Sequence, residues 1–337
     1  MSSASHLCLV MPLYGGDLKA FTHRSSGGAL PFPLVRQILF DVLRGLRHAH
    51  SRGWIHTDLK RDNIFVENHM STTEIRRWLE DNPPRRHPLE QSLDCVVQAA
   101  VSQPLPVISL EMAMRSTFVL GDFSCGTLSQ YTTWAQNTHK IGLSSAQPVG
   151  TEDDVDVTIL PLRPPEVILG YPWSGASSDI WSFGCLVRKV FSSVYRHTYQ
   201  TSRFQAFQIV TGQRLFSCGE DPDANSAADA LNMLYDMMCI TNEAFKRKLL
   251  EKAANLLDFF TVRLNMKTRS KTFALKKHAP QITPRPLESC IAATGAALTP
   301  ADMEAVAALV RRCLRLDPEE RPTADVLLSD PIFHGLQ

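Results

Sequence analysis

The sequence predicts an α+β fold that is mainly helical, and three observations support this. Between about residues 33 and 51, apolar residues recur at the spacing of one helix face, and these are Val35, Ile38, Leu39, Val42, Leu43 and Leu46. Short apolar runs at 54–55, 64–66 and 118–120 indicate strands beside polar loops. The alanine-rich stretch 301–314 predicts a second packing helix. A chain of 337 residues can bury one large core or two domains.

Composition bounds the class of protein. The formal net charge of +1 gives no whole-molecule argument for binding nucleic acid or an anionic membrane. The 8 cysteines are scattered without a C-x-x-C pair, which favours reduced thiols over zinc ligands or disulfides. No basic region precedes the apolar run 7–14, and no apolar run is long enough to span a membrane. We therefore expect a soluble, intracellular protein, cytoplasmic and/or nuclear, with no direct contact to nucleic acid or membrane.

The amino-terminal elements follow from local patterns. The apolar run 7–14 predicts a buried strand ended by two glycines, and a short polar helix is expected at 17–22. The amphipathic helix at about 33–51 comes next. Gly53 stands where a helix end favours a residue that can take positive φ.

A polar loop lies between two predicted strands. It reads His-Thr-Asp-Leu-Lys-Arg-Asp-Asn, residues 56–63, and follows Trp54-Ile55. The loop places a carboxylate, Asp58, a cation, Lys60, and a carboxamide, Asn63, within a few residues of one another. A strand at 64–66 follows, so the polar groups are expected on a rigid frame.

The middle of the chain is less regular. Residues 67–115 combine a helical stretch at 73–80, a turn rich in proline and arginine at 82–86 and an apolar segment broken by proline at 101–110. We interpret 67–115 as a long insertion. The strand that follows it runs directly into Asp122-Phe-Ser.

Three further motifs lie downstream. They are Leu162-Arg-Pro-Pro-Glu-Val-Ile-Leu-Gly170, Ser178-Asp-Ile-Trp-Ser-Phe-Gly-Cys-Leu-Val187 and Leu316-Asp-Pro-Glu-Glu-Arg-Pro-Thr323. Residues 188–206 interrupt the pattern after the second motif, because their charged side chains suit a buried helix poorly. Our hypothesis is that 188–206 is an unspliced intron or a recent insertion.

Together these motifs resemble the large lobe of eukaryotic protein kinases, and most closely a divergent, fungal type of SR-protein kinase. Residues 56–63 match the kinase catalytic-loop pattern H-x-D-L-x-x-x-N, with Thr57 in place of the usual arginine. The resemblance divides the chain into 1–16, a hinge-strand remnant of the small lobe, and 17–334, the large lobe with insertions at about 67–115 and 188–206. It also implies an activation segment that works without phosphorylation, since the usual arginine binds the phosphate of that segment and the neutral Thr57 cannot.

The resemblance implies ATP and Mg²⁺ as cofactors and assigns catalytic roles. Asp58 would accept the proton of the attacking hydroxyl, and Lys60 would face the transferring phosphate. Asn63 and Asp122 would hold magnesium. The residues expected to contact the nucleotide are Met11, Leu13, Tyr14, Asp17 and Phe65.

The resemblance also implies structural roles. His56 would brace the catalytic loop, and Asp179 would accept hydrogen bonds from the loop's backbone. Glu166 and Arg321 would form a buried, bidentate ion pair. Residues 152–156 are interpreted as a solvated acidic loop, or alternatively as a docking patch for basic, Arg-Ser-rich substrates.

The resemblance sets an expectation about activity as well. The kinase small lobe supplies a Gly-rich loop, a strand lysine and a helix glutamate, and we expect these to be largely missing here. A nucleotide would then be enclosed on one side only, so little turnover is expected from this chain alone.

Three functions compete at this point. The first is a serine/threonine protein kinase acting on protein substrates, including Arg-Ser-rich splicing factors, as a monomer if the chain is complete. The second is a catalytically inactive remnant that acts as a binding module. The third is a small-molecule phosphotransferase, which shares the loop pattern; Pro-Pro-Glu, Asp179 and Arg321 argue against it.

Overall fold

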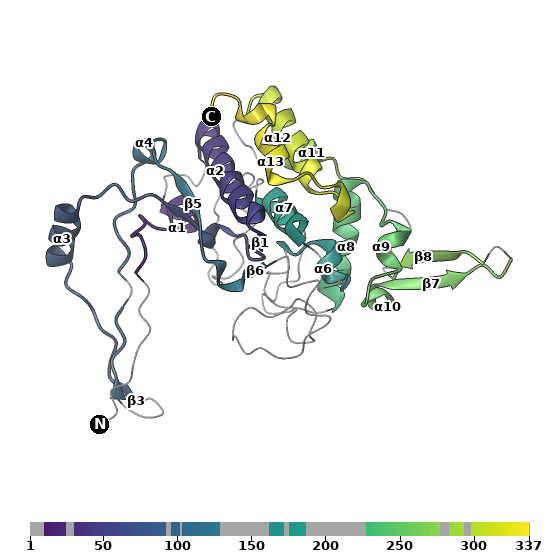
Figure 1. The fold of residues 1–337 in the computed structure, drawn as a ribbon, viewed down its shortest axis with the longest axis horizontal. Helices are drawn as coiled ribbons and strands as arrows, with labels where there is room; N and C mark the ends of the chain where they lie inside the picture. Colours follow the sequence, from purple (N-terminus) through teal and green to yellow (C-terminus); the bar gives the residue numbers. More distant parts are fainter. Residues whose placement is uncertain are drawn as a thin grey trace.

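The computed structural model describes residues 10–24, 30–91, 96–101, 103–128, 162–171, 175–186, 227–267, 269–276, 283–292 and 298–336. These residues form a mainly helical body with short strands, from which two arms extend on opposite sides (Figure 1). The α+β class is therefore confirmed. Among the helices that the structure describes, none has the length and apolar character needed to cross a membrane.

The helices carry most of the body. The α-helices are α1 (Leu18–Arg24), α2 (Phe32–Ser51), α3 (Thr72–Asp81), α4 (Leu110–Ala113), α6 (Pro165–Ile168), α7 (Gly175–Leu186), α8 (Ala227–Thr241), α9 (Arg247–Leu250), α10 (Leu256–Phe259), α11 (Leu287–Ala292), α12 (Pro300–Cys313) and α13 (Ala324–Leu328). Short 3₁₀ helices are η1 (Arg61–Asn63), η2 (Phe123–Cys125), η4 (Pro318–Glu320) and η5 (Pro331–Phe333).

The strands pair two by two, all antiparallel. They are β1 (Trp54–Ile55), β2 (Ile64–Val66), β3 (Glu90–Gln91), β4 (Val96–Val97), β5 (Phe118–Leu120), β6 (Thr127–Leu128), β7 (Phe260–Leu264) and β8 (Lys271–Leu275). The pairs are β1 with β6, β2 with β5, β3 with β4 and β7 with β8. The first two pairs flank the predicted polar loop and hold its two ends.

Helix α2 lies at the centre of the core, as its apolar spacing predicts. Pro33 suits the first turn, where its missing N–H leaves no unsatisfied donor. The apolar face of α2 is buried and packs against α13, β5 and η5. The helix ends at Ser51, and Gly53 just beyond it has φ of 77°, in the left-handed region that glycine tolerates. The predicted role of Gly53 is therefore confirmed.

Helix α7 is the buried central helix that the second motif predicts. Every residue from Ser178 to Leu186 is buried, so this part of the helix has no solvent-facing side. It packs against α12, the helix predicted at 301–314, and contacts β1. The polar residue Asp179 in such an environment needs hydrogen-bond partners, and these define the site described below.

Of the two elements expected near the amino terminus, the strand at 7–14 is absent from its described part, whereas the helix at 17–22 is present as α1. Residues 10–14 form no strand, and Val10 is 99% and Leu13 55% exposed. A strand requires a hydrogen-bonded neighbour, and within the described residues backbone pairing with the body begins only at Gly15, Gly16 and Asp17. The helix α1 exists, but it is not simply polar, because Leu18 and Phe21 are buried in the core.

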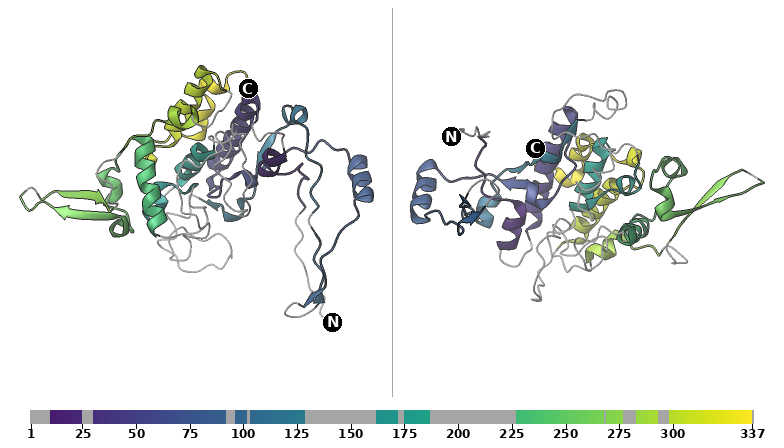
Figure 2. Two further views of the ribbon diagram at one scale, coloured as in Figure 1. Left: turned by 180° about the vertical axis from the view of Figure 1, so that it is seen from behind. Right: turned by 90° about the horizontal axis from the view of Figure 1, so that it is seen from below.

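One arm is formed by the segment interpreted as an insertion. It carries α3, the β3–β4 pair and α4, and Figures 1 and 2 show it extending away from the body. No residue of α3 is buried. The helix is stabilised locally by a capping box in which Ser71 and Glu74 satisfy each other's backbone N–H groups. That 67–115 is an insertion stays a prediction.

The other arm is the β7–β8 hairpin, which the sequence patterns did not predict.

Several expectations lie outside the described residues, namely the segment 188–206, the acidic loop 152–156 and most of the segment after Asp122. The described cysteines 185, 239, 290 and 313 are free thiols, in agreement with the expectation for them.

Candidate active site

The backbone of the polar loop is held by the buried carboxylate of Asp179 on α7. Its two oxygens accept hydrogen bonds from the N–H of His56 at 2.8 Å and of Thr57 at 2.9 Å. Thr57 has φ of 66°, a conformation that a β-branched residue rarely adopts. The two hydrogen bonds offset this strain. The contact predicted between Asp179 and the loop is therefore present.

His56 links the loop to the end of β5. Its Nε2 lies 2.9 Å from the carbonyl oxygen of Gly121, and its Nδ1 accepts from the N–H of Asp58 at 3.2 Å. Because a carbonyl can only accept, Nε2 is the ring nitrogen that donates, and Nδ1 is the one that accepts. The ring is fully buried and packs on Phe123 at 4.6 Å between centroids. This arrangement has the bracing geometry expected of His56.

Asp58 is the centre of the loop's polar groups. It is 5% exposed, and its Oδ2 accepts hydrogen bonds from Lys60 Nζ at 2.5 Å and Asn63 Nδ2 at 3.1 Å. Within the described part of the chain, its Oδ1 is buried and has no hydrogen-bond partner. A buried polar atom without a partner is costly, so Oδ1 is available to accept a hydrogen bond from a bound hydroxyl.

Lys60 supplies positive charge beside this carboxylate. Partial burial lowers the pKa of Lys60, but the hydrogen bond from its ammonium group to Asp58 raises it. The negative charges of Asp58, Asp62 and Asp122 raise it further, so the pKa of Lys60 lies above its ordinary value. The ammonium group therefore remains charged at neutral pH and is placed to attract an anion such as phosphate.

Asn63 and Asp122 fit a magnesium ion by the chemistry of their oxygens. The N–H of Gly121 donates to the carbonyl of Asn63 at 3.0 Å, which brings the residue before Asp122 beside Asn63. The amide nitrogen of Asn63 is engaged by Asp58, so its amide oxygen is the atom that can ligate a cation. Asp122 is exposed, and Ser124 donates a hydrogen bond to its Oδ1 at 2.6 Å.

Carboxylate and amide oxygens are ligands that magnesium prefers. The described residues contain no group of three or more His, Cys, Asp and Glu side chains that could hold a metal. Two protein ligands with further oxygens from water and phosphates match the usual way in which magnesium is bound beside a nucleotide. Asn63 and Asp122 are thus the residues that would hold the ion.

The residues expected to contact a nucleotide are only partly brought together. The ring of Tyr14 stacks on Phe65 at 5.4 Å and 17°, and Asp17 forms a backbone bridge to Phe65. The carboxylate of Asp17 caps α1 by accepting the N–H of Ala20 at 2.7 Å. Met11 is 74% exposed, and Leu13 is also exposed. Neither lies in an enclosed site within the described residues.

Gly121 is a residue that the sequence analysis missed. A Cβ at this position would lie 2.8 Å from the ring of Phe65, which is too close. Glycine therefore allows the ring to lie against the backbone just before Asp122. The signal in the sequence was the glycine directly before Asp122.

The predicted ion pair between Glu166 and Arg321 is present. The two terminal nitrogens of the guanidinium, Nη1 and Nη2, each donate to one carboxylate oxygen at 2.6 Å, and both side chains are completely buried. Arg321 also donates to the carbonyl of Ser177 at 3.0 Å and lies over the ring of Trp181 at 5.0 Å. The pair joins α6 to the loop before α13.

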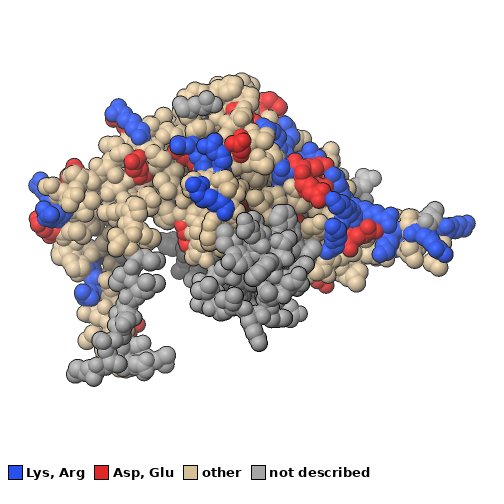
Figure 3. Space-filling model, viewed as in Figure 1, with Lys and Arg blue, Asp and Glu red and all other residues tan. Residues whose placement is uncertain are grey.

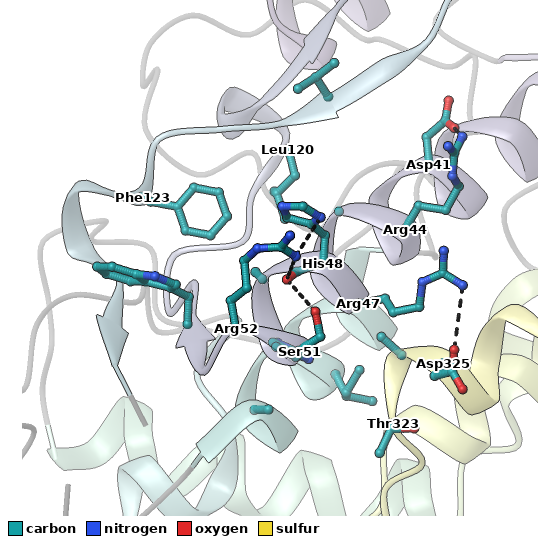
Figure 4. A pocket seen from close by; sticks show the side chains of 18 of the residues that line it. Asp41, Arg44, Arg47, His48, Ser51, Arg52, Leu120, Phe123, Thr323 and Asp325 are labelled. Atoms are coloured by element: carbon teal, nitrogen blue, oxygen red, sulfur yellow. Dashed lines mark hydrogen bonds and ion pairs between the residues drawn. The ribbon is translucent and has the colours of Figure 1, made fainter. Parts of the chain in front are cut away.

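A large cavity lies beside helix α2. It measures about 1260 Å³ and is bordered by α2, β5, α7 and α13 (Figure 4). Two ion pairs lie in its lining, Arg44 with Asp41 at 3.5 Å and Arg47 with Asp325 at 3.7 Å. Burial raises the pKa of Asp41 above its ordinary value, even though the Phe118 N–H and Arg44 lower it. Asp58, Lys60 and Asn63 do not line this cavity, so the loop's chemistry, not cavity size, identifies the candidate site.

Comparison with known proteins points to the same chemistry. Residues 1–76 match the model of the protein kinase domain. The resemblance to protein kinases is confirmed. A probable serine/threonine-protein kinase, clkA, from Dictyostelium discoideum is 26% identical over 186 residues, which cover 55% of this chain and 16% of that protein. The serine/threonine-protein kinase SRPK of Physarum polycephalum is 23% identical over 237 residues, which cover 69% of this chain and 48% of that protein.

A plant protein kinase is also similar to this chain. The serine/threonine-protein kinase AFC3 of Arabidopsis thaliana is 24% identical over 212 residues, which cover 63% of this chain and 38% of that protein. The chain thus spans less than half of the length of these three relatives. Its similarity is to serine/threonine kinases of this group, at low identity.

Proposed function

We propose that this chain carries the catalytic loop of a serine/threonine protein kinase, which transfers the γ-phosphate of ATP to hydroxyls on protein substrates. The observation that supports this most directly is the state of Asp58. One oxygen of its buried carboxylate is held by Lys60 and Asn63, and the other is without a partner in the described residues. This is the geometry that a base for a substrate hydroxyl requires.

Each residue of the loop would have its own role in phosphate transfer. Asp58 Oδ1 would accept a hydrogen bond from the substrate hydroxyl, orient its oxygen toward the phosphorus and take its proton. Lys60 lies beside Asp58 and would offset negative charge on the transferring phosphate. When bound by Asn63 and Asp122, magnesium supplies charge neutralisation of the phosphate oxygens. His56 and Asp179 keep the loop in this conformation.

The proposal extends to the class of protein substrate. The similarity to a kinase named SRPK supports Arg-Ser-rich proteins as substrates, and we propose splicing factors of this composition. A cytoplasmic and/or nuclear location and a monomeric state, if the chain is complete, would be consistent with this role. The division into a hinge remnant and a large lobe also remains a proposal.

A binding module without transferase activity is the second candidate. The exposure of Met11 and Leu13 supports it, because the described residues enclose a nucleotide's base on one side only. Ligand sites normally bury most of the ligand's surface. Such a chain would bind nucleotide or a protein partner without turning ATP over.

The test measures binding and transfer separately on the whole chain. Phosphate transfer from ATP to an Arg-Ser-repeat peptide would be followed with magnesium, and ATP binding would be followed by calorimetry. We expect Asp58→Asn to reduce transfer by about 10²-fold or more without abolishing ATP binding. Asp325→Asn, the same chemical change at a side chain of α13 that is 74% exposed and pairs with Arg47, should leave both quantities unchanged.

The outcomes separate the two candidates. ATP binding without transfer by the unchanged chain would favour the binding module. Transfer that survives Asp58→Asn would refute the assigned role of Asp58. Absence of both binding and transfer would remove the kinase proposal for this chain.

A further inference from the structure

The β7–β8 hairpin is an isolated two-stranded sheet that projects from the body (Figures 1 and 2). Its strands pair in register from Phe260 opposite Leu275 to Leu264 opposite Lys271. In the part of the chain that the structure describes, no third strand pairs with either edge. Among the described residues, both edges of the hairpin are therefore unpaired.

The hairpin concentrates positive charge in a chain that is nearly neutral. The whole chain has 35 Lys and Arg against 34 Asp and Glu. Residues 259–287 contain no Asp or Glu, and their cations are Arg263, Lys267, Arg269, Lys271, Lys276, Lys277 and Arg285. Figure 3 shows blue side chains along this arm, with no red toward its tip.

The cations nearest the tip are available to a partner. Arg263, Lys267, Arg269 and Lys271 are all exposed, and none forms an ion pair with another described residue. The neighbouring helix α9 differs, because Lys248 pairs there with Glu319 at 2.8 Å. Positive charges without local partners favour an anionic ligand.

The hydrogen-bond pattern shows which backbone groups face outward. The N–H of Asn265 donates to Ser270, and that of Lys276 donates to Phe259. Antiparallel pairs alternate between bonded and non-bonded, so Val262 opposite Phe273 and Leu264 opposite Lys271 are non-bonded pairs. Along the outer edge of β8, the backbone N–H and C=O groups of Lys271 and Phe273 therefore point away from β7.

We infer that the outer edge of β8 binds an acidic, extended segment of a partner protein, which adds a third strand to the hairpin. The added strand would use the outward backbone groups of Lys271 and Phe273. Its acidic side chains would lie beside Arg269 and Lys271. Cations on an open edge also discourage pairing with neutral or basic strands. Arg269 and Lys271 would therefore favour an acidic strand over other strands.

A peptide fits this surface better than a nucleic acid does. Leu264 is 54% and Met266 82% exposed at the end of the hairpin. These apolar side chains can contact the apolar side chains of a peptide, whereas the phosphates of a nucleic acid provide no apolar surface for them. No side chain of the described hairpin is an exposed aromatic residue on which a base could stack. The cations alone would bind nucleic acid weakly and with strong salt dependence.

The test uses the whole chain and a fluorescent peptide of about eight residues in which Glu and Val alternate, long enough to match one strand. We expect saturable binding by fluorescence anisotropy. The double variant Arg269→Glu and Lys271→Glu should weaken binding about tenfold or more, because two attractive contacts become repulsive. The matched control is Arg263→Glu with Lys267→Glu, which makes the same charge change on β7 and in the turn and should have a smaller effect.

A second probe separates strand addition from charge attraction. The same peptide methylated on alternate backbone nitrogens keeps its charge but loses the ladder hydrogen bonds, and it should bind at least tenfold more weakly. Equal binding of both peptides, equal effects of the two double variants, or stronger binding of a duplex DNA oligonucleotide would overturn the inference. Absence of peptide binding would overturn it as well. None of these readouts depends on kinase activity.

Discussion

At the scale of single residues, Asp179 decides the shape of the catalytic loop. Its carboxylate joins three groups from two segments, the backbone N–H of His56, the backbone N–H of Thr57 and the side chain of His50 at 2.9 Å. The left-handed Thr57 costs of order 1–2 kcal/mol in isolation, and the hydrogen bonds from Asp179 compensate for it. The loop that positions Asp58 thus depends on a residue that touches no substrate.

Asp179→Asn tests this dependence. The amide can accept at one oxygen only, and its NH₂ group would face a backbone N–H donor. We expect the free energy of unfolding to fall by about 2–4 kcal/mol, measured by denaturant titration. The exposed variant Asp325→Asn should change stability by less than about 0.5 kcal/mol. A loss under about 1 kcal/mol for Asp179→Asn would contradict the proposed role.

At the scale of elements, the contact between α7 and α12 depends on Gly184. A Cβ at this position would lie 2.6 Å from Cβ of Cys313 and 2.9 Å from Leu314. Both neighbours are buried, and Cys313 is completely enclosed. Because those contacts leave no room for a methyl group, the two helices can approach closely only while residue 184 has no side chain. The enclosure also affects Cys313, since burial raises the pKa of its thiol to about 12.

Gly184→Ala should separate these helices slightly. We expect a loss of about 1–3 kcal/mol in unfolding free energy, since buried atoms must shift to admit the methyl group. Labelling of Cys313 by a maleimide in the folded protein should become faster as the contact opens. Glu304→Ala, at a side chain of α12 that is 66% exposed, serves as the control and should alter neither quantity. Unchanged labelling and stability for Gly184→Ala would show that the helices repack without cost.

At the scale of the whole molecule, the pair of Glu166 and Arg321 connects parts of the chain that are 155 positions apart. It holds the segment 162–171 against the carboxy-terminal helices. Both groups are completely buried, so each compensates the charge of the other. The stability that this pair confers depends on both partners being present.

Glu166→Gln should destabilise the fold by about 3–5 kcal/mol, because the guanidinium of Arg321 would lose its buried counter-charge. Adding Arg321→Met should recover part of that loss, since it removes the stranded charge. A double-mutant cycle measured by denaturant unfolding gives the coupling between the two side chains. Strictly additive effects would mean that the two charges are solvated independently.

Local sequence patterns were sufficient to predict the secondary structure of the central part of the fold. The periods of α2 and α12, the apolar character of α7 and the short strands β1, β2 and β5 are all set by residues close in sequence. The loop from His56 to Asn63 was recognisable for the same reason, since its polar groups lie within one short segment. The partners of Asp179 and Glu166 followed from family resemblance, and the structure shows both contacts.

What required the tertiary structure was every property that depends on a distant neighbour. Residues 10–14 have the composition of a strand but form none, because no described segment offers them a continuous ladder. Three further properties are not visible in the sequence pattern. Within the described part of the chain, they are the Asp58 oxygen without a partner, the enclosed Cβ position of Gly184 and the unpaired, basic edge of β8. Short-range periodicity and residue type specify helices and a catalytic loop, whereas pairing, burial and exposure are decided only when separate segments meet.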